Sequence, residues 1–139
     1  MIYNEMPWGE LVTVEINDNY LIQQFVIEPG KETPLAYHKE CDIELTVLSG
    51  HGLIDKPNWF NQMQYETFDA KSHFSLDCNS PYKIINQSSV DKLIILRTTF
   101  GMVLAERFQT GGNIQFDTYH IEKDEDYPSR IVLSDQFLF

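Results

Sequence analysis

One stretch decides the fold of this sequence. Residues 28–50 read EPGKETPLAYHKECDIELTVLSG: an apolar strand end, a Pro-Gly turn, a single histidine (His38), and an alternating segment closed by Ser49-Gly50. Apolar and polar residues alternate from Ile43 to Leu48, which is typical of a strand with one buried face. Ile43 is therefore expected to face a core, and Glu44 the opposite side.

Similar short segments, separated by turn signals, run through most of the chain. They are rich in β-branched and aromatic residues, and no long stripe with the period of a helix competes with them. The segments are 11–16, 20–27, 43–48, 52–54, 65–68, 73–77, 82–86, 93–99 and 102–108. This pattern predicts an all-β fold with two packed sheets, a jelly roll.

Length and charge limit the classes of function. A chain of 139 residues is expected to form a single domain over 1–139, with a barrel core at about 7–108 and a C-terminal extension at about 109–139. Its formal net charge of -11 disfavours nucleic acid and anionic membranes as partners. The chain begins without a signal-like segment, so a cytoplasmic location is expected. The apolar end of the extension, 131–139, favours a homodimer that would bury it.

Several separated motifs resemble one family in order and spacing. They are Pro7-Trp8-Gly9, residues 27–30, Tyr37-His38, residues 47–50, and the segment 82–86. Together they resemble the cupin domain of type II mannose-6-phosphate isomerases, a member of the RmlC-like cupin superfamily. The resemblance covers about residues 7–108. It implies a double-stranded β-helix, the jelly-roll barrel of the cupins, and a metal site inside it.

The residues at the positions of the family's metal ligands mostly cannot bind a metal. His38 is kept, but Ala36, Ile43 and Tyr82 stand where the resemblance implies other ligands. One imidazole does not hold a first-row metal, because such sites usually take three or more protein ligands. A degenerate site without a cofactor is therefore expected, with a divalent Zn, Mn, Ni or Fe ion as the alternative.

A rearranged metal site stays open as an alternative. Glu44 lies one residue beyond the implied glutamate position, so a β-bulge could turn it inward beside His38. Asp42 or Asp77 could also act as a substitute ligand. The alternation around Ile43 argues against the bulge, because it places Glu44 on the outer face.

The inner face is expected to carry His38 and Tyr82, together with Gln23 and Arg97. These side chains can donate and accept hydrogen bonds within a mostly apolar cup, which suits a small polar ligand. A catalytic interpretation uses His38 as general base and Tyr82 as general acid, as in metal-independent sugar epimerases of this barrel type. The structural alternative is a satisfied histidine and a tyrosine that fills the barrel.

Three functions are compatible with these residues. The first is a small-molecule-binding cupin, with a carbohydrate-like ligand that the aromatic loop residue Trp59 could also contact. The second is a sugar or sugar-phosphate isomerase or epimerase, acting through His38 and Tyr82 or through a rearranged metal site. The third is a non-catalytic interaction or oligomerisation module, in which Trp59 packs on the barrel or in a dimer contact.

Overall fold

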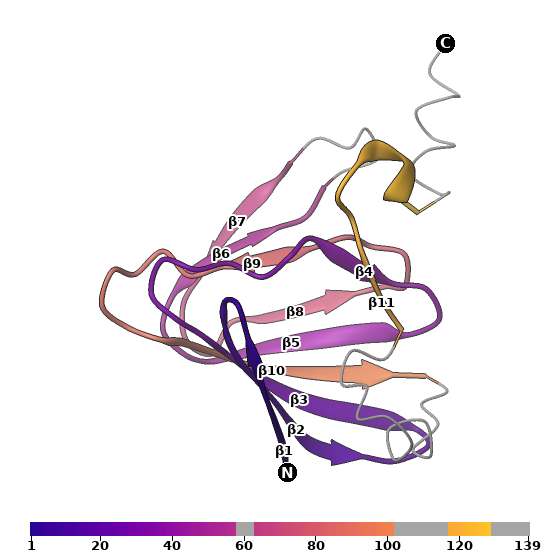
Figure 1. Cartoon of the computed structure of the whole chain (residues 1–139), viewed down its shortest axis with the longest axis horizontal. Coiled ribbons are helices and arrows are strands. Elements are labelled where there is room, and N and C mark those ends of the chain that lie inside the picture. The colour runs from indigo at the N-terminus through magenta and orange to yellow at the C-terminus, as the bar shows by residue number, and fades with distance from the viewer. Residues whose placement is uncertain (58–62, 102–116, 129–139) are drawn as a thin grey trace.

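Eleven strands form two facing layers in the computed structural model, which describes residues 1–57, 63–101 and 117–128 (Figure 1). One layer is a six-stranded sheet in the order β1-β2-β3-β10-β5-β8. Its strands are antiparallel and comprise β1 (Ile2–Met6), β2 (Gly9–Ile16), β3 (Tyr20–Ile27), β5 (Asp42–Ser49), β8 (His73–Leu76) and β10 (Leu93–Phe100).

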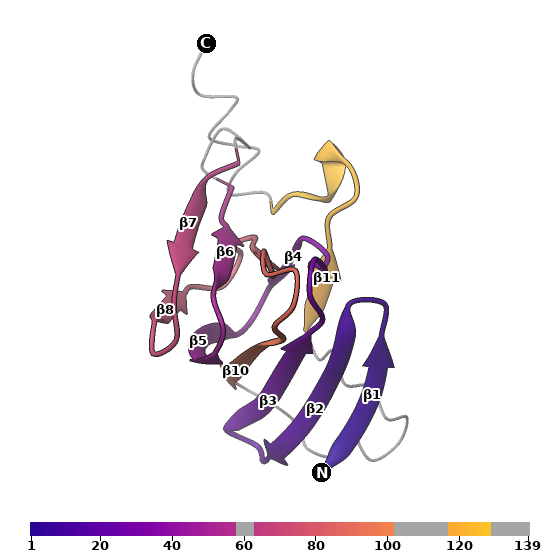
Figure 2. The same ribbon diagram turned by 90° about the vertical axis from the view of Figure 1, so that its left-hand side faces the viewer.

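The second layer lies across from the first and consists of two small sheets (Figure 2). One has the order β7-β6-β9 and contains β6 (Gly52–Asp55), β7 (Tyr65–Phe68) and β9 (Lys83–Ile85). The other pairs β4 (Ala36–His38) with β11 (Thr118–His120). A 3-10 turn, η1 (Asp124–Asp126), follows β11, and no helix long and apolar enough to cross a membrane occurs among the described residues.

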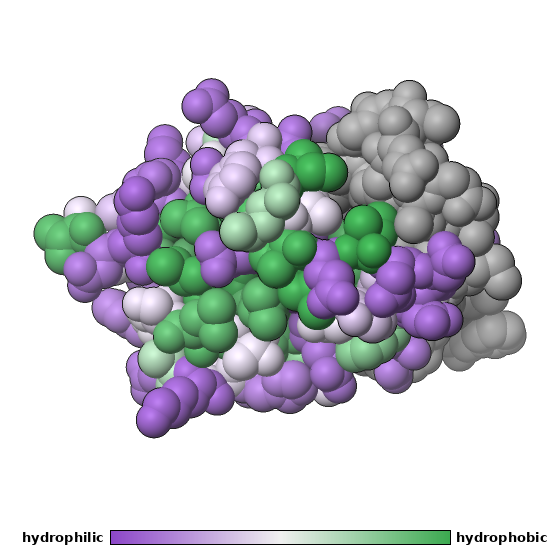
Figure 3. Space-filling model, turned by 90° about the horizontal axis from the view of Figure 1, so that it is seen from below, coloured by the Kyte–Doolittle hydropathy of each residue, from purple (hydrophilic) through white to green (hydrophobic). Residues whose placement is uncertain are grey.

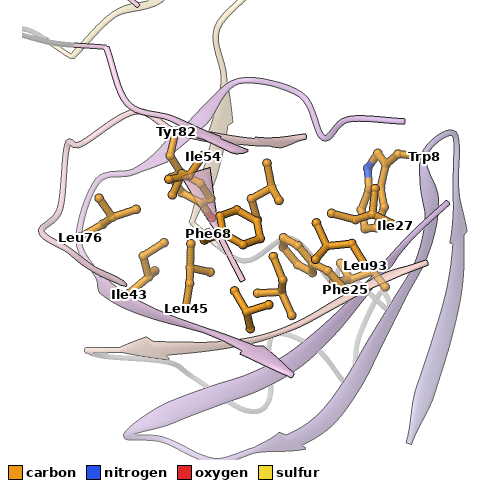
Figure 4. Close-up of a cluster of buried hydrophobic side chains, with 14 residues drawn as sticks. Trp8, Phe25, Ile27, Ile43, Leu45, Ile54, Phe68, Leu76, Tyr82 and Leu93 are labelled. Atoms are coloured by element: carbon orange, nitrogen blue, oxygen red, sulfur yellow. The ribbon is translucent and has the colours of Figure 1, made fainter. Parts of the chain in front are cut away.

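The core fills the space between the layers, and alternation in the longest strands determines which side chains enter it. In β3 every second residue is buried, and β10 repeats this pattern from Leu93 to Thr99. Figure 4 shows the resulting cluster of aliphatic and aromatic side chains from both layers. Burial of these side chains is the main stabilising contribution that a sheet-on-sheet architecture offers.

Gly9 explains why the Pro-Trp-Gly motif needs its glycine. Its φ of +150° belongs to a conformation that residues with a Cβ rarely adopt. A Cβ at this position would also lie 1.9 Å from the carbonyl oxygen of Val26 on the paired strand β3. Glycine therefore allows β2 to begin directly against β3, immediately after Trp8 enters the core.

The all-β, double-sheet prediction is confirmed, and eight of the predicted segments coincide with β2, β3 and β5–β10. The segment 102–108 and the candidate Trp59 lie outside the described residues. Sequence patterns missed β1, β4 and β11, so paired strands extend beyond residues 7–108 at both ends. The strands β4 and β11 have only three residues each, too few for alternation to become visible.

Candidate functional site

A row of three polar side chains crosses the inner face of the six-stranded sheet. Thr13 in β2 is the register partner of Gln23 in β3, which is in turn the partner of Arg97 in β10. Gln23 Nε2 donates to Thr13 Oγ1 at 3.2 Å, and Arg97 Nη2 donates to Gln23 Oε1 at 2.6 Å. All three residues are buried. The register of the sheet alone therefore builds a polar row in an otherwise apolar core.

The second layer contributes His38 and Tyr82. His38 ends β4, and Tyr82 forms an isolated bridge with Ala36 just before β9. The His38 Nε2 atom and the Tyr82 hydroxyl lie 3.0 Å apart, and Arg97 Nη1 donates to the same hydroxyl at 2.9 Å. The structure thus brings together the four residues that the sequence placed on the inner face, and their hydrogen bonds join the two layers.

The direction of each hydrogen bond follows from the chemistry of its partners. A guanidinium can only donate, so the Tyr82 oxygen accepts from Arg97 and its proton is directed to His38 Nε2. The other ring nitrogen of His38, Nδ1, lies 3.2 Å from the backbone carbonyl of Asp117, which can only accept. His38 is therefore the neutral Nδ1–H tautomer. We call this chain from Arg97 through Tyr82 and His38 to Asp117 the relay.

Electrostatics keep His38 neutral as well. Burial lowers the pKa of His38 from 6.5 to about 3, and the nearby charge of Arg97 acts in the same direction. The Asp117 carbonyl opposes this shift without cancelling it. Within the relay, the only lone pair of the ring already accepts a bond from Tyr82. A proton or a metal ion would have to displace Tyr82 before it could bind His38.

Arg97 is the least compensated group in the site. It is 4% exposed, and no carboxylate among the described residues forms an ion pair with it. Its Cζ lies 4.7 Å from the centroid of the Phe25 ring, and its Nε has no hydrogen-bond partner in the described ranges. A buried cation is expensive unless it is paired, so this guanidinium is held by neutral acceptors and an aromatic face only.

A cavity of about 40 Å³ adjoins Arg97. Its lining is mostly apolar, with the Tyr82 and Arg97 side chains among its few polar groups. The residues that line it are Trp8, Leu11, Phe25, Thr33, Pro34, Ala36, Tyr82, Arg97, Thr118 and His120. An apolar cavity with a small number of polar groups is typical of a small-molecule site.

A larger groove of about 590 Å³ lies beside β4 and β11. Tyr37 and Tyr119 stack there with ring centroids 5.5 Å apart, and Lys39 Nζ lies 4.5 Å from the Tyr119 centroid. Asn79 and Tyr127 also line this groove. His120 borders both the groove and the inner cavity.

The alternative metal ligands are not brought to His38. Glu44 lies on the outer face of β5, where its Oε2 is 3.9 Å from His73 Nε2, while Ile43 points into the core. The register irregularity between β5 and β10 falls at Ile94/Ile95, not beside Glu44, so the alternative of a bulge that turns Glu44 inward is wrong, as the alternation around Ile43 predicted. This placement corrects the proposal of a metal site shared by His38 and Glu44.

The two aspartates also stay away from the inner face. Asp42 is exposed and accepts a hydrogen bond from the backbone N–H of Cys78, and Asp77 is exposed after β8. Among the described residues, no group of three or more His, Cys, Asp or Glu side chains could hold a metal ion. The residues present on the inner face therefore do not fit the metal that the cupin resemblance implies.

Sequence reasoning missed one residue that positions the site. Asp117 has a φ of +55°, its carbonyl accepts from His38, and its Oδ2 accepts from the backbone N–H groups of Glu40 and Cys41. It thereby fixes the chain before β11 against the turn between β4 and β5. An aspartate in the left-handed region is a weak sequence signal, and nothing local in the sequence connects it to His38.

Comparisons of sequence and of structure give different results. No protein-family model matches the sequence, and neither does any curated protein. In structure, the chain is similar to the capsular polysaccharide assembling protein CapF from Staphylococcus aureus, with a TM-score of 0.68 and 15% identity over 88% of this chain. It is also similar to an oxalate decarboxylase from Lactobacillus farciminis, solved as a formate complex, with a TM-score of 0.66 and 16% identity over 74% of this chain.

Those two proteins are much longer, since the match spans only 32% of each. An RmlC-like cupin from Desulfovibrio desulfuricans is closer in size: the match covers 65% of this chain and 79% of that one, with a TM-score of 0.54 and 19% identity. At such low identity, the likeness concerns the fold and not the activity. The facing sheets and these neighbours agree that the chain has the double-stranded β-helix fold of the cupins.

Proposed function

We propose that this protein binds a small polar molecule in the cavity beside Arg97 and performs no chemistry at His38 and Tyr82. One observation carries the proposal: Arg97 is buried on the wall of a mostly apolar cavity, with N–H capacity that no described residue uses. Buried donors without acceptors are rare in folded proteins, and a ligand that is absent from the structure is a common reason for them.

The ligand is expected to be carbohydrate-like, with only part of it in the cavity. A volume of about 40 Å³ has room for a few water-sized groups, so a whole sugar ring would not fit there. The larger groove, with its stacked Tyr37 and Tyr119, could take the rest, and His120 borders both spaces. One structural neighbour is a capsular polysaccharide assembling protein, CapF, which supports this class of ligand.

The isomerase or epimerase alternative requires His38 to accept a proton from a substrate. In the relay, His38 Nε2 is bonded to Tyr82, and the low pKa of His38 makes it a weak base. Tyr82 likewise directs its proton to His38 and not to the cavity. Incubation of sugars with the protein in D2O tests this directly, since an epimerase would exchange the C–H beside the carbonyl. We expect no deuterium incorporation; incorporation that is lost in His38→Asn would establish the enzyme.

The binding proposal can be tested by filling the cavity. Ala36→Leu places extra volume on the cavity wall, whereas Ala70→Leu makes the same change at an exposed turn. A panel of hexoses, hexuronic acids, sugar phosphates and short carboxylic acids is titrated by calorimetry. We expect saturable binding of at least one compound to the wild type and Ala70→Leu, and none to Ala36→Leu. If no compound binds, the interaction-module alternative is supported and the proposal is wrong.

A further inference from the structure

The clearest unexplained feature is the buried positive charge of Arg97, for which the described part of the chain supplies no counter-charge. Two of the five N–H groups of Arg97 are used, one by Tyr82 and one by Gln23, and both acceptors are neutral. The Nε–H meets no acceptor within residues 1–57, 63–101 and 117–128. Charged side chains are almost never this deeply buried unless they are paired, so the expected partner of Arg97 is an anion.

A second unused donor lies on the same cavity. Trp8 lines the cavity together with Arg97, and its indole nitrogen is buried with no hydrogen-bond partner among the residues that the structure describes. Its ring packs on Phe25 at a centroid distance of 5.3 Å, and Phe25 also carries the guanidinium of Arg97 on its face. In Figure 4 the indole nitrogen is on the side of the ring that faces the rest of the cluster. A buried tryptophan N–H usually has an acceptor.

We infer that the group entering the cavity is the carboxylate of a small molecule, bound by the guanidinium of Arg97 with the Trp8 indole N–H as a further donor. This inference rests on the proposed binding function and narrows it to one class of ligand. A carboxylate offers only acceptors, which matches a cavity whose unused groups are both donors.

The size and charge of the site favour a carboxylate over a phosphate. A planar carboxylate fits the guanidinium fork and needs little volume, in keeping with a cavity of about 40 Å³. A phosphate is bulkier and carries more charge, and the net charge of -11 would oppose its approach more strongly. Tyr82 and Gln23 hold two guanidinium nitrogens in place, so the binding group is pre-organised before the anion arrives.

The test compares acetate with acetamide, a neutral molecule of nearly the same shape. Binding of each to the whole wild-type protein is measured by calorimetry and by the shift in Tm at neutral pH, with sodium chloride keeping the ionic strength constant. Inorganic phosphate is the third probe. We expect saturable binding of acetate, no binding of acetamide, and weaker binding of phosphate than of acetate.

Variants then assign the binding to Arg97. Arg97→Met removes the buried charge, and Lys92→Met removes an exposed charge immediately before β10 as a matched control. Acetate should bind Arg97→Met at least about tenfold more weakly, because hydrogen bonds to charged groups are worth this much or more. Lys92→Met should bind it as the wild type does. If Arg97→Met does not fold, Trp8→Phe replaces it as the test. This variant keeps an aromatic ring but loses the indole N–H, and it should weaken acetate binding.

The outcomes separate this inference from the binding proposal. If acetamide or a neutral sugar binds as well as acetate, or if acetate binding survives in Arg97→Met, the carboxylate assignment is overturned. The broader proposal that the protein binds a small molecule then still stands. Tighter binding of phosphate than of acetate also overturns it. If none of these probes binds and the wider panel fails as well, both proposals fall.

Discussion

The Tyr82 hydroxyl donates to His38 Nε2 at 3.0 Å while its oxygen accepts from Arg97 Nη1 at 2.9 Å. This one hydroxyl therefore links His38 in the second layer to Arg97 in β10, a central strand of the six-stranded sheet. It also determines the His38 tautomer, because a ring nitrogen that accepts from Tyr82 cannot carry the proton. The hydrogen bonds of the inner face therefore form one network, so a substitution of one residue in it should also weaken the hydrogen bonds of the others.

Removing the hydroxyl in Tyr82→Phe should destabilise the protein by about 1–3 kcal/mol, because Arg97 Nη1 then loses its acceptor inside the core. Tyr37→Phe is the matched control. Tyr37 stacks on Tyr119 outside the relay, so its ring contact survives the loss of the hydroxyl. Urea unfolding of both variants measures the free energies. Equal stability of the two variants would contradict the relay.

The neutral state of His38 predicts a loss of stability in acid. Folded His38 has a pKa of about 3, whereas in the unfolded chain the group titrates near 6.5. The unfolded state alone therefore gains a proton as the pH falls below about 6.5, and folding is disfavoured progressively until about pH 3. At pH 5 this amounts to about 2 kcal/mol relative to pH 7.

In His38→Asn, the free energy of unfolding should lack the decrease between pH 7 and pH 5 that His38 causes. Free energies of unfolding at pH 7 and pH 5 are compared among the wild type, His38→Asn and His51→Asn. His51 is an exposed loop residue, so its variant should follow the wild-type profile. A wild type and His38→Asn that lose the same stability between the two pH values would show that His38 is protonated in the folded state.

Alternation within strands predicted only some of the residues of this site. The other features depend on contacts between segments that are far apart in the sequence. The period of two in β3 and β10 is enough to place Gln23 and Arg97 on the inner face, and the cupin resemblance suggested that His38 and Tyr82 would join them. No local pattern shows that Arg97 has no carboxylate partner among the residues that the structure describes. The contact between His38 and Asp117 spans 79 residues of sequence, and only the folded chain reveals it.

Asp55 offers a test of buried charge away from the site. It ends β6 fully buried, and the backbone N–H of Gln64 favours its ionised form without offsetting this burial. Burial raises its pKa, and the opposing attraction of Lys83, its register partner in β9, does not cancel the effect. The folded state consequently favours the protonated carboxyl, so this group weakens folding as the pH rises above about 3.9.

Asp55→Asn should therefore be more stable than the wild type at pH 7, and the difference should shrink as the pH falls to 4. Asp69→Asn, at an exposed turn, controls for the loss of one negative charge from an acidic protein. Unfolding free energies at the two pH values decide the question. The prediction fails if Asp55→Asn is less stable than the wild type at pH 7.

The outer face of the six-stranded sheet carries an apolar surface. Seen from below, hydrophobic side chains gather across its middle, with hydrophilic ones around them (Figure 3). Leu48 in β5 and Phe100 in β10 are 48% and 41% exposed, and Leu96 in β10 and Ile22 in β3 on the same face are half-buried. A patch of this kind marks an interaction surface more often than a free one. We propose that a second copy of the chain covers it, as expected for a homodimer.

Charge placed on this face should separate the dimer. Leu48→Glu with Phe100→Glu would bury like charges across a symmetric interface, because each patch faces its own copy. Val90→Glu makes the same kind of change at a side chain that is 77% exposed in the loop before β10. Sedimentation equilibrium at micromolar concentration should give a dimer for the wild type and Val90→Glu, and a monomer for the double variant. A monomeric wild type would exclude the dimer. A double variant that stays dimeric would show that the dimer interface is not this face.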